Sequence, residues 1–377
     1  MLRRADTGDA LAATLFGIGI AVIAGCGGGG GGSQTPPVAL KATPSPGPIT
    51  ITEYVLPSTG NFGVGPWGIT TGADGGVWYL DHDGAPTEGR IDPTTHAIAQ
   101  YRAALPSPQP YVNCGQGLAP GSDGGLWGAF MCGTADPLGP EENDGAIARF
   151  DPTTHAVQQY SITGNYACPG DIASGPDGRM WFTLQCQGLV GIGAINEQTG
   201  AITYWQLPND PACSTDFPNG MTLGPDGAMW FGISGYPCAA PGFLARIAPS
   251  TGVITTVPIP AGTYSCPYSI VTGPDRALWF TLACNPGGIG RYDPVKKTFN
   301  EYPLITQNTQ PHEIVAGADS ALYFGEWNAA KIGRITLTGT VTEYVMPTQA
   351  YTYGFTLGPD NAVWFTETTA NQLGRIK

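Results

Sequence analysis

The chain has 377 residues, among them 56 glycines and 35 prolines, and only 12% of its residues are charged, about half the usual share. This much Gly and Pro excludes a mostly helical protein, while a hydrophobic content of 42% excludes wholesale disorder. The formal net charge is -13, and no cluster of Lys and Arg follows the first four residues, so a nucleic-acid partner is excluded. Turn-rich β-structure is the remaining expectation.

The N-terminus has the features of an export signal. Arg3 and Arg4 precede an apolar run, Ala10–Ile23, of about 14 residues, which is too short to cross a bilayer comfortably. The run ends in Ile23-Ala24-Gly25-Cys26, which resembles the lipobox of bacterial lipoproteins, where the cysteine is acylated. We therefore expect a signal peptide over residues 1–25 and a lipid on Cys26. The alternative is an ordinary signal peptide that is cleaved nearby.

A low-complexity segment follows this signal. The glycine run Gly27–Gly32 and the Pro-rich stretch Pro36–Pro48 have no apolar periodicity, which is typical of a flexible and then stiffer tether. Residues 26–48 are therefore predicted to hold an extracytoplasmic domain, residues 49–377, at a bacterial membrane through the lipid anchor. The choice between the inner and outer membranes stays open at this point.

The rest of the chain is repetitive. An aromatic residue after an Asp-containing turn recurs with spacings of 49, 54, 49, 49, 44 and 41 residues. These spacings are typical of four-stranded propeller blades. The sequence therefore predicts an all-β, seven-bladed β-propeller. The seven aromatic residues are Trp78, Trp127, Trp181, Trp230, Trp279, Tyr323 and Trp364.

The two ends of the repeat region are complementary. The chain ends at Gly374-Arg375-Ile376, which corresponds to a third strand, so the last blade lacks its fourth strand. Residues 51–56 match the fourth strand of the preceding blade, residues 341–346. We therefore expect the N-terminal strand 51–56 to complete blade 7 and close the ring, which leaves no open edge there.

The cysteines follow the same repeat. There are nine, and assigning Cys26 to the lipid leaves eight, two in each of blades 2 to 5. Repeat positions place the members of each pair on neighbouring strands, so we expect four disulfides within blades. A metal site is the alternative, but no two cysteines have the Cys-x-x-Cys spacing. The expected pairs are Cys114–Cys132, Cys168–Cys186, Cys213–Cys238 and Cys266–Cys284.

One column of the repeat is expected to face the channel. Eleven positions before each blade aromatic, at the start of the innermost strand, the side chain varies from blade to blade. These positions should surround one mouth of the channel, where propellers commonly bind ligands. The ring consists of Trp67, Gln116, Gly170, Asn219, Tyr268, His312 and Tyr353.

A second column is acidic in only three blades. Three positions after the blade aromatic stand Asp81, Glu326 and Glu367, whereas the other blades have apolar residues there. Blades 6, 7 and 1 are adjacent in a closed ring, so we predict a polar and aromatic site for a small ligand or peptide at their mouth. The alternative is that these are ordinary rim residues. The predicted ligand-binding residues are Trp67, Asp81, His312, Glu326, Tyr351, Tyr353 and Glu367.

The repeats carry a family resemblance across roughly residues 50–377. Recurring Gly-Pro-Asp-Gly turns, Trp-Phe-Thr strands and Ile-Gly-Arg-Ile strands resemble those of the virginiamycin B lyases, also called streptogramin B lyases. Blade 6 is the most similar: Pro311-His312 is followed by Gly325-Glu326-Trp327 and by residues 331–335. The resemblance implies that His312 contacts substrate and that the fold is a propeller.

The family's chemistry implies further roles. These lyases open the lactone of a cyclic depsipeptide by Mg-assisted elimination, with a Glu-Pro-His segment in the last blade that supplies a metal ligand and the base. Here the corresponding segment is Tyr351-Thr352-Tyr353, while Glu367 stands where the family has a second acid near the metal. A tyrosine with an ordinary pKa near 10 is a poor base at neutral pH.

Two main functions follow. The first is a lipid-anchored propeller, expected to be a monomer, that binds a ligand or partner at the mouth without cleaving streptogramins. The second is a carbon-oxygen lyase with a rearranged site, in which His312 is the catalytic base and Glu326, Glu367 and Asp81 hold a cation. The family resemblance implies Mg as that cofactor. A cell-envelope scaffold is a third alternative, for which no particular patch stands out.

Overall fold

The structure is a computed structural model that describes residues 49–57, 65–81, 87–102, 115–130, 145–162, 168–186, 189–207, 216–235, 242–260 and 266–377. All of them belong to one compact unit, Pro46–Lys377. The predicted signal peptide, Cys26 and the tether lie outside the described residues. So do Cys114, Cys132, Cys213 and Cys238, together with the side chains of Asp81 and Cys186.

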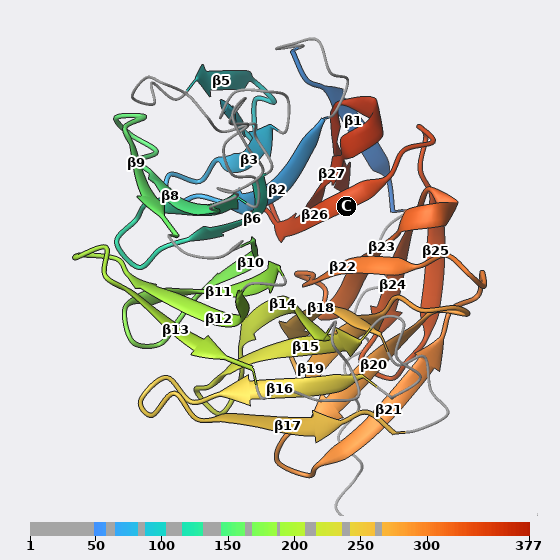
Figure 1. Cartoon of the computed structure of the whole chain (residues 1–377). Helices are drawn as coiled ribbons and strands as arrows, with labels where there is room; N and C mark the ends of the chain where they lie inside the picture. Colours follow the sequence, from blue (N-terminus) through green and yellow to red (C-terminus); the bar gives the residue numbers. More distant parts are fainter. Residues whose placement is uncertain are drawn as a thin grey trace, which may run out of the picture. The chain divides into compact units, whose positions relative to one another are not determined.

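The architecture is a ring of seven sheets with four antiparallel strands each, a β-propeller as expected from the repeats (Figure 1). Blade 1 contains β2 (Pro66–Thr71), β3 (Val77–Asp81), β4 (Thr87–Ile91) and β5 (Ile98–Arg102). Blade 2 contains β6 (Gly115–Pro120), β7 (Leu126–Phe130), β8 (Ala146–Phe150) and β9 (Val157–Ser161). Blade 3 contains β10 (Pro169–Ser174), β11 (Arg179–Cys186), β12 (Leu189–Asn196) and β13 (Ile202–Gln206).

The later blades repeat this order. Blade 4 contains β14 (Asp216–Leu223), β15 (Met229–Gly235), β16 (Phe243–Ile247) and β17 (Ile254–Pro258). Blade 5 contains β18 (Pro267–Thr272), β19 (Leu278–Leu282), β20 (Gly288–Asp293) and β21 (Thr298–Pro303). Blade 6 contains β22 (Pro311–Ala316), β23 (Ala321–Glu326), the 3-10 turn η1 (Trp327–Ala329), β24 (Lys331–Thr336) and β25 (Val341–Val345). Blade 7 contains β26 (Thr352–Leu357), β27 (Val363–Glu367), η2 (Thr368–Ala370), β28 (Gln372–Ile376) and β1 (Ile51–Val55).

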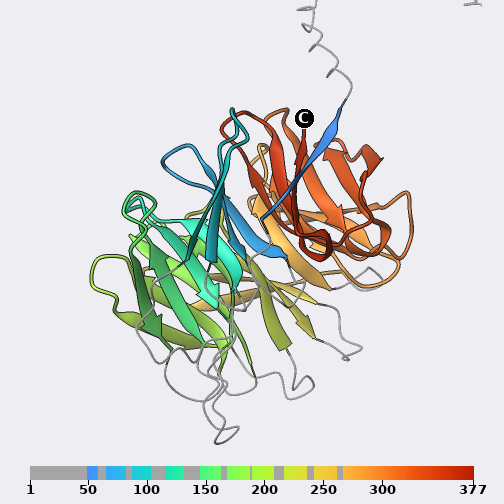
Figure 2. The same ribbon diagram turned by 90° about the horizontal axis from the view of Figure 1, so that it is seen from above.

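The ring closes as predicted. β1 pairs antiparallel with β28, with Ile51 opposite Ile376 and Val55 opposite Gln372. Figure 2 shows this N-terminal strand, in blue, beside the red strands from the end of the chain. The N-terminal segment thus covers an edge that the last three strands would otherwise expose.

The apolar cores lie between neighbouring blades. Trp181 of blade 3, for example, packs with Met229 and Phe231 of blade 4, and all three side chains are buried. In each blade the turn Asp holds the blade aromatic, as Asp275 does by accepting a 3.0 Å hydrogen bond from Trp279 Nε1 and one of 2.8 Å from Arg291 Nε. The recurrent turn therefore fixes the core of the blade and has a structural role.

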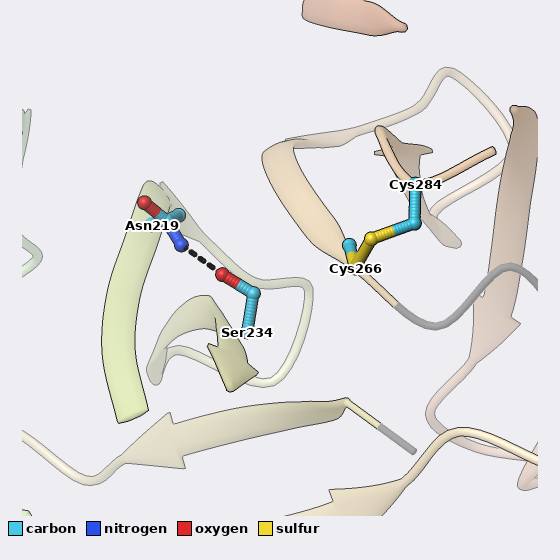
Figure 3. The surroundings of a disulfide bond; sticks show 4 residues. All are labelled: Asn219, Ser234, Cys266 and Cys284. Carbon is cyan, nitrogen blue, oxygen red and sulfur yellow. Dashed lines mark hydrogen bonds between the residues drawn. A yellow bond between two sulfur atoms is a disulfide. The ribbon is translucent and has the colours of Figure 1, made fainter. Parts of the chain in front are cut away.

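One disulfide is fully described. Cys266 and Cys284 are bonded across the open end of the first hairpin of blade 5, with Cα atoms 5.3 Å apart (Figure 3). Cys168 in blade 3 is also disulfide-bonded. In blade 4, Asn219 Nδ2 donates a 2.6 Å hydrogen bond to Ser234 Oγ in a similar position between the first two strands (Figure 3).

Candidate functional site at the channel

The innermost strand of every blade contains a register shift close to its start. In blade 6, Pro311 pairs with Glu326 and Ile314 pairs with Phe324, so two residues oppose the single Gly325. Such β-bulges redirect side chains. The bulge contains His312 and Glu313, and Glu313 lines the channel cavity.

The innermost strands surround a channel cavity that is open to solvent, with an empty space of about 490 Å³ when the solvent at its mouth is included. Five of the seven residues in the first predicted ring line it, together with Asp171 and Glu313, which directly follow ring positions. The full lining is Gln116, Gly117, Gly170, Asp171, Gln185, Asn219, Gly220, Tyr268, Glu313 and Tyr353.

Two tyrosines, Tyr268 and Tyr353, line the cavity. The Tyr353 hydroxyl donates a 2.7 Å hydrogen bond to Gln116 Oε1 and also shares a hydrogen bond with the Tyr268 hydroxyl. Burial, with Glu313 nearby, raises the pKa of both hydroxyls above the ordinary value. Both groups therefore keep their protons at neutral pH, and Tyr353 cannot serve as a base there.

Asp171 is anchored by backbone amides. Its two carboxylate oxygens accept hydrogen bonds of 2.9 Å from Ile172 N and 2.7 Å from Met221 N, the second of which lies in blade 4. Burial raises its pKa to about 6, although both amides favour the charged form. Asp171 thus joins two inner strands and brings a carboxylate to the cavity wall.

Glu313 is the second acid of the cavity. Ser269 Oγ of blade 5 donates a 2.6 Å hydrogen bond to Glu313 Oε2. Burial and the nearby Asp171 raise the pKa of Glu313 to about 8. Without a cation in the cavity, the two acids therefore tend to carry a single negative charge at neutral pH.

His312 lies between two aromatic rings. Its ring centroid is 4.3 Å from that of Tyr268 and 4.4 Å from that of Trp327, and both pairs are stacked. Burial lowers the pKa of His312 to about 4, so the imidazole is neutral at pH 7. Its Nδ1 atom is buried and has no hydrogen-bond partner among the described residues.

The aromatic row continues outward from His312. Trp327 in η1 stacks on Tyr351 with centroids 4.9 Å apart and an interplanar angle of 11°. Tyr351 is 44% exposed, so the row reaches solvent. On the other side, Tyr353 packs against Trp67 of blade 1 at 4.2 Å. The structure therefore brings together Trp67, His312, Tyr351 and Tyr353 from the predicted set and adds Trp327.

The two described acids of the second predicted ring occupy a different environment. Glu326 is 1% exposed, and burial together with Glu343 of its own fourth strand raises its pKa to about 7. Glu367 is fully buried, and burial together with Glu53 of β1 raises its pKa to about 8. Neither residue is part of the cavity lining. Each lies instead near an acid on the fourth strand of its own blade. Their predicted roles as metal ligands stay predictions.

The described residues do not fit a Mg site of the kind that the family resemblance implies. Tyr351-Thr352-Tyr353 supplies neither a carboxylate nor an imidazole. Within the described ranges, no three or more His, Cys, Asp and Glu side chains are placed to hold one metal ion. We therefore derive no chemical step through Mg.

Asp171, Glu313, Gln185 and Trp327 were not among the residues predicted from the sequence. A usable signal exists for the two acids, because the column that follows the first ring contains Gly or Ser in every other blade. The other members of that column are Gly68, Gly117, Gly220, Ser269 and Gly354.

Comparison with known proteins places this ring of blades in a family. The virginiamycin B lyase family model matches residues 251–377. Virginiamycin B lyase from Staphylococcus aureus is 30% identical in sequence, with a TM-score of 0.69 over 87% of this chain and 99% of that chain. The chain belongs to the virginiamycin B lyase family.

Other solved structures agree. A streptogramin B lyase structure is 28% identical, with a TM-score of 0.69 over 87% of this chain and 97% of that chain. A catalytically inactive histidine-to-alanine variant of the S. aureus enzyme, solved with quinupristin, is 30% identical with the same TM-score and the same coverage of this chain.

A more distant likeness concerns the fold alone. The extracellular domain of a B. thetaiotaomicron protein is 16% identical, with a TM-score of 0.59 over 83% of this chain and 40% of that chain. No match was found among curated protein sequences. In the part of the chain that the structure describes, no helix has the length and apolar character needed to cross a membrane.

Proposed function

We propose that this protein is an extracytoplasmic, lipid-anchored propeller that binds a small molecule or peptide at the channel mouth and does not cleave streptogramins. The observation that carries the proposal is the row formed by His312, Trp327 and Tyr351, which leads from solvent to the edge of the polar channel cavity. Flat aromatic rings beside hydrogen-bonding groups are typical of ligand sites. The lipid anchor rests on the sequence around Cys26.

The last blade argues against the family reaction. The catalytic segment of the lyases is replaced by Tyr351-Thr352-Tyr353, and Tyr353 holds its proton in a hydrogen bond to Gln116. A general base must accept a proton near the operating pH. Recognition of a ligand, in contrast, requires no general base.

A rearranged lyase is the second candidate, and one observation favours it. His312 is neutral at pH 7, and no described residue bonds its Nδ1. It is therefore free to accept a proton, although a pKa of about 4 makes it a weak base. Family membership keeps this candidate relevant.

Quinupristin is a suitable first probe because a relative was solved with it. We expect calorimetric titration to show binding to the wild-type protein, and Tyr351→Ala to weaken that binding about tenfold by removing the outer ring of the row. Tyr204→Ala is the matched control, since Tyr204 is 37% exposed on β13 of blade 3. Absence of binding, or equal weakening by both substitutions, would overturn the mouth as the ligand site.

A further inference from the structure

The channel cavity is lined by hydrogen-bond acceptors and by no basic side chain. Its lining residues contribute two carboxyls, three side-chain amides and two tyrosine hydroxyls, with neither Lys nor Arg among them. A buried carboxylate without a cationic partner is costly. The charge of the lining therefore favours a positively charged ligand and disfavours an anionic one.

The acceptor that remains available belongs to Glu313. Its Oε2 atom accepts the hydrogen bond from Ser269, whereas no donor among the described residues bonds its Oε1 atom. Glu313 lines the cavity, so its carboxyl is the acceptor offered to a ligand there. Asp171, in contrast, is held by two backbone amides and contributes mainly its charge.

Further acceptors lie on the opposite side of the channel. Gln185 uses its Nε2 to donate hydrogen bonds of 3.0 Å to Pro218 O and 3.2 Å to Asn219 Oδ1. These two bonds fix the orientation of the amide, so its oxygen is the atom left for a ligand. A donor with several hydrogens, placed between Gln185 and Glu313, would satisfy both sides.

We propose that the channel cavity receives the ammonium group of a small organic amine. This inference rests on the proposed ligand binding at the mouth and names the chemical class of that ligand: an amine whose apolar or aromatic part lies against the row of Trp327 and Tyr351. An ammonium group donates three hydrogen bonds and pairs with carboxylates, which fits the two acids and the amide oxygen.

A divalent metal ion fits the cavity less well. Calcium requires about six to eight oxygen ligands, and magnesium a regular octahedron. Both oxygens of Asp171 already accept amide hydrogen bonds, and no group of three or more acidic, His or Cys ligands lies together in the described ranges. The geometry therefore favours an organic cation.

Binding of a cation should release a proton. Glu313 and Asp171 both line the cavity. The other titratable groups near them are Tyr268 and Tyr353, which stay neutral, and His312, which stacks on Tyr268 and whose pKa burial lowers to about 4. With burial and Asp171 raising the pKa of Glu313 to about 8, affinity for an ammonium should rise as the pH increases from 6 to about 8.5 and both acids ionise.

The test uses benzylammonium as the probe and neutral benzyl alcohol as its matched control, with the complete protein and ligand-observed NMR. We expect benzylammonium to bind at least ten times more tightly than benzyl alcohol, and Glu313→Gln to remove that preference. The glutamine keeps an acceptor for Ser269 and so preserves the fold. Glu88→Gln is the control variant because Glu88 is a buried acid, 3% exposed, on β4 of blade 1.

The outcomes separate this inference from the proposed function. Equal binding of the two probes, unchanged affinity in Glu313→Gln, or no binding of benzylammonium would overturn it. Displacement of benzylammonium by micromolar Mg or Ca would also overturn it and assign the cavity to a metal ion.

If quinupristin binds while benzylammonium does not, only the ammonium assignment fails. If neither binds, the proposed function fails with it. Wild-type affinity that does not change between pH 6 and 8.5 would contradict the role of the two acids even if a variant failed to fold.

Discussion

The Tyr353 hydroxyl donates a 2.7 Å hydrogen bond to Oε1 of Gln116, which links the inner strands of blades 7 and 2 across the channel. By resemblance, Tyr353 stands where the lyases have their catalytic histidine. Its proton is engaged, and burial raises the pKa of its hydroxyl well above the ordinary value. This position therefore contributes to the channel wall and not to proton abstraction.

The first prediction concerns lactone opening. The wild-type protein, incubated with quinupristin and Mg at pH 7.5, should leave the lactone intact, because Tyr353 remains protonated and Tyr351 supplies no carboxylate. Mass spectrometry and chromatography would detect the linear product, with the S. aureus lyase as positive control. Mg-dependent opening that disappears in His312→Ala would favour the rearranged lyase instead.

The propeller itself could be predicted from the sequence because each blade repeats the same local requirements. The turn Asp, the aromatic four residues later and an Arg form one hydrogen-bonded unit, as in Asp275, Trp279 and Arg291. Such a unit leaves a periodic trace in the sequence. The pairing of β1 with β28 could be predicted for the same reason, since residues 51–56 repeat the fourth-strand pattern.

The acids of the channel cavity were missed because the bulge changes the alternation of the strand. A regular strand turns consecutive side chains to opposite faces, so the residue after His312 would be expected to point away from the channel. The bulge instead lets two consecutive residues, such as Gly170 and Asp171, both line the cavity. Glu326 and Glu367, which follow regular pairing, lie near fourth-strand acids, a tertiary contact that no local pattern reveals.

The second prediction concerns the protonation of His312. Burial between Tyr268 and Trp327 holds the pKa of its imidazole at about 4, below the ordinary 6.5. Between pH 4 and pH 6.5 the folded protein therefore binds fewer protons than the unfolded chain. The unfolding free energy should decrease by about 3 kcal/mol as the pH falls from 6.5 through 4. NMR of the ring protons should show no titration above pH 5.

A variant tests this assignment through stability. His312→Phe keeps a flat ring between the two aromatic neighbours but cannot be protonated. It should lose less stability than the wild type when urea unfolding is compared at pH 6.5 and pH 4. A histidine signal that titrates near pH 6.5 and disappears in this variant would contradict the buried, neutral imidazole.

The third prediction concerns Glu367. Burial, with Glu53 nearby, raises the pKa of this carboxyl to about 8, whereas it ionises near 4.5 in the unfolded chain. The folded protein thus retains a proton that the unfolded chain loses, and this stabilising contribution decreases as the pH rises from 4.5 through 8. Glu367→Gln stays neutral at every pH. It should therefore reduce the loss of stability between pH 5 and pH 9 by about 4 kcal/mol, the free energy that corresponds to the shift of the Glu367 pKa from 4.5 to about 8.

A residue with the opposite shift provides the contrast. Backbone hydrogen bonds from Lys296 and Val295 hold the pKa of Asp293 below its usual range. Asp293→Asn should therefore lower stability at neutral pH and have little effect at pH 2. Denaturant unfolding across pH would measure both variants. If Glu367→Gln followed the wild-type curve, the buried carboxyl would not be protonated in the folded state.

The last prediction concerns the closure of the ring. Within β1, Tyr54 stacks on Trp364 of blade 7 with centroids 5.4 Å apart, and Leu56, which follows, is 3% exposed. Deleting residues 51–55 would expose the edge of β28 and the apolar side chains beneath it. We expect the full chain with this deletion to lose about 5 kcal/mol or more of unfolding free energy and to form oligomers through the open edge.

Deletion of five glycines, residues 28–32, is the length-matched control and should leave melting temperature and sedimentation unchanged. Equal melting temperatures for the two deletions, with both proteins monomeric, would show that blade 7 does not depend on β1; aggregation of the first deletion alone would instead tie the stability of the whole ring to this strand.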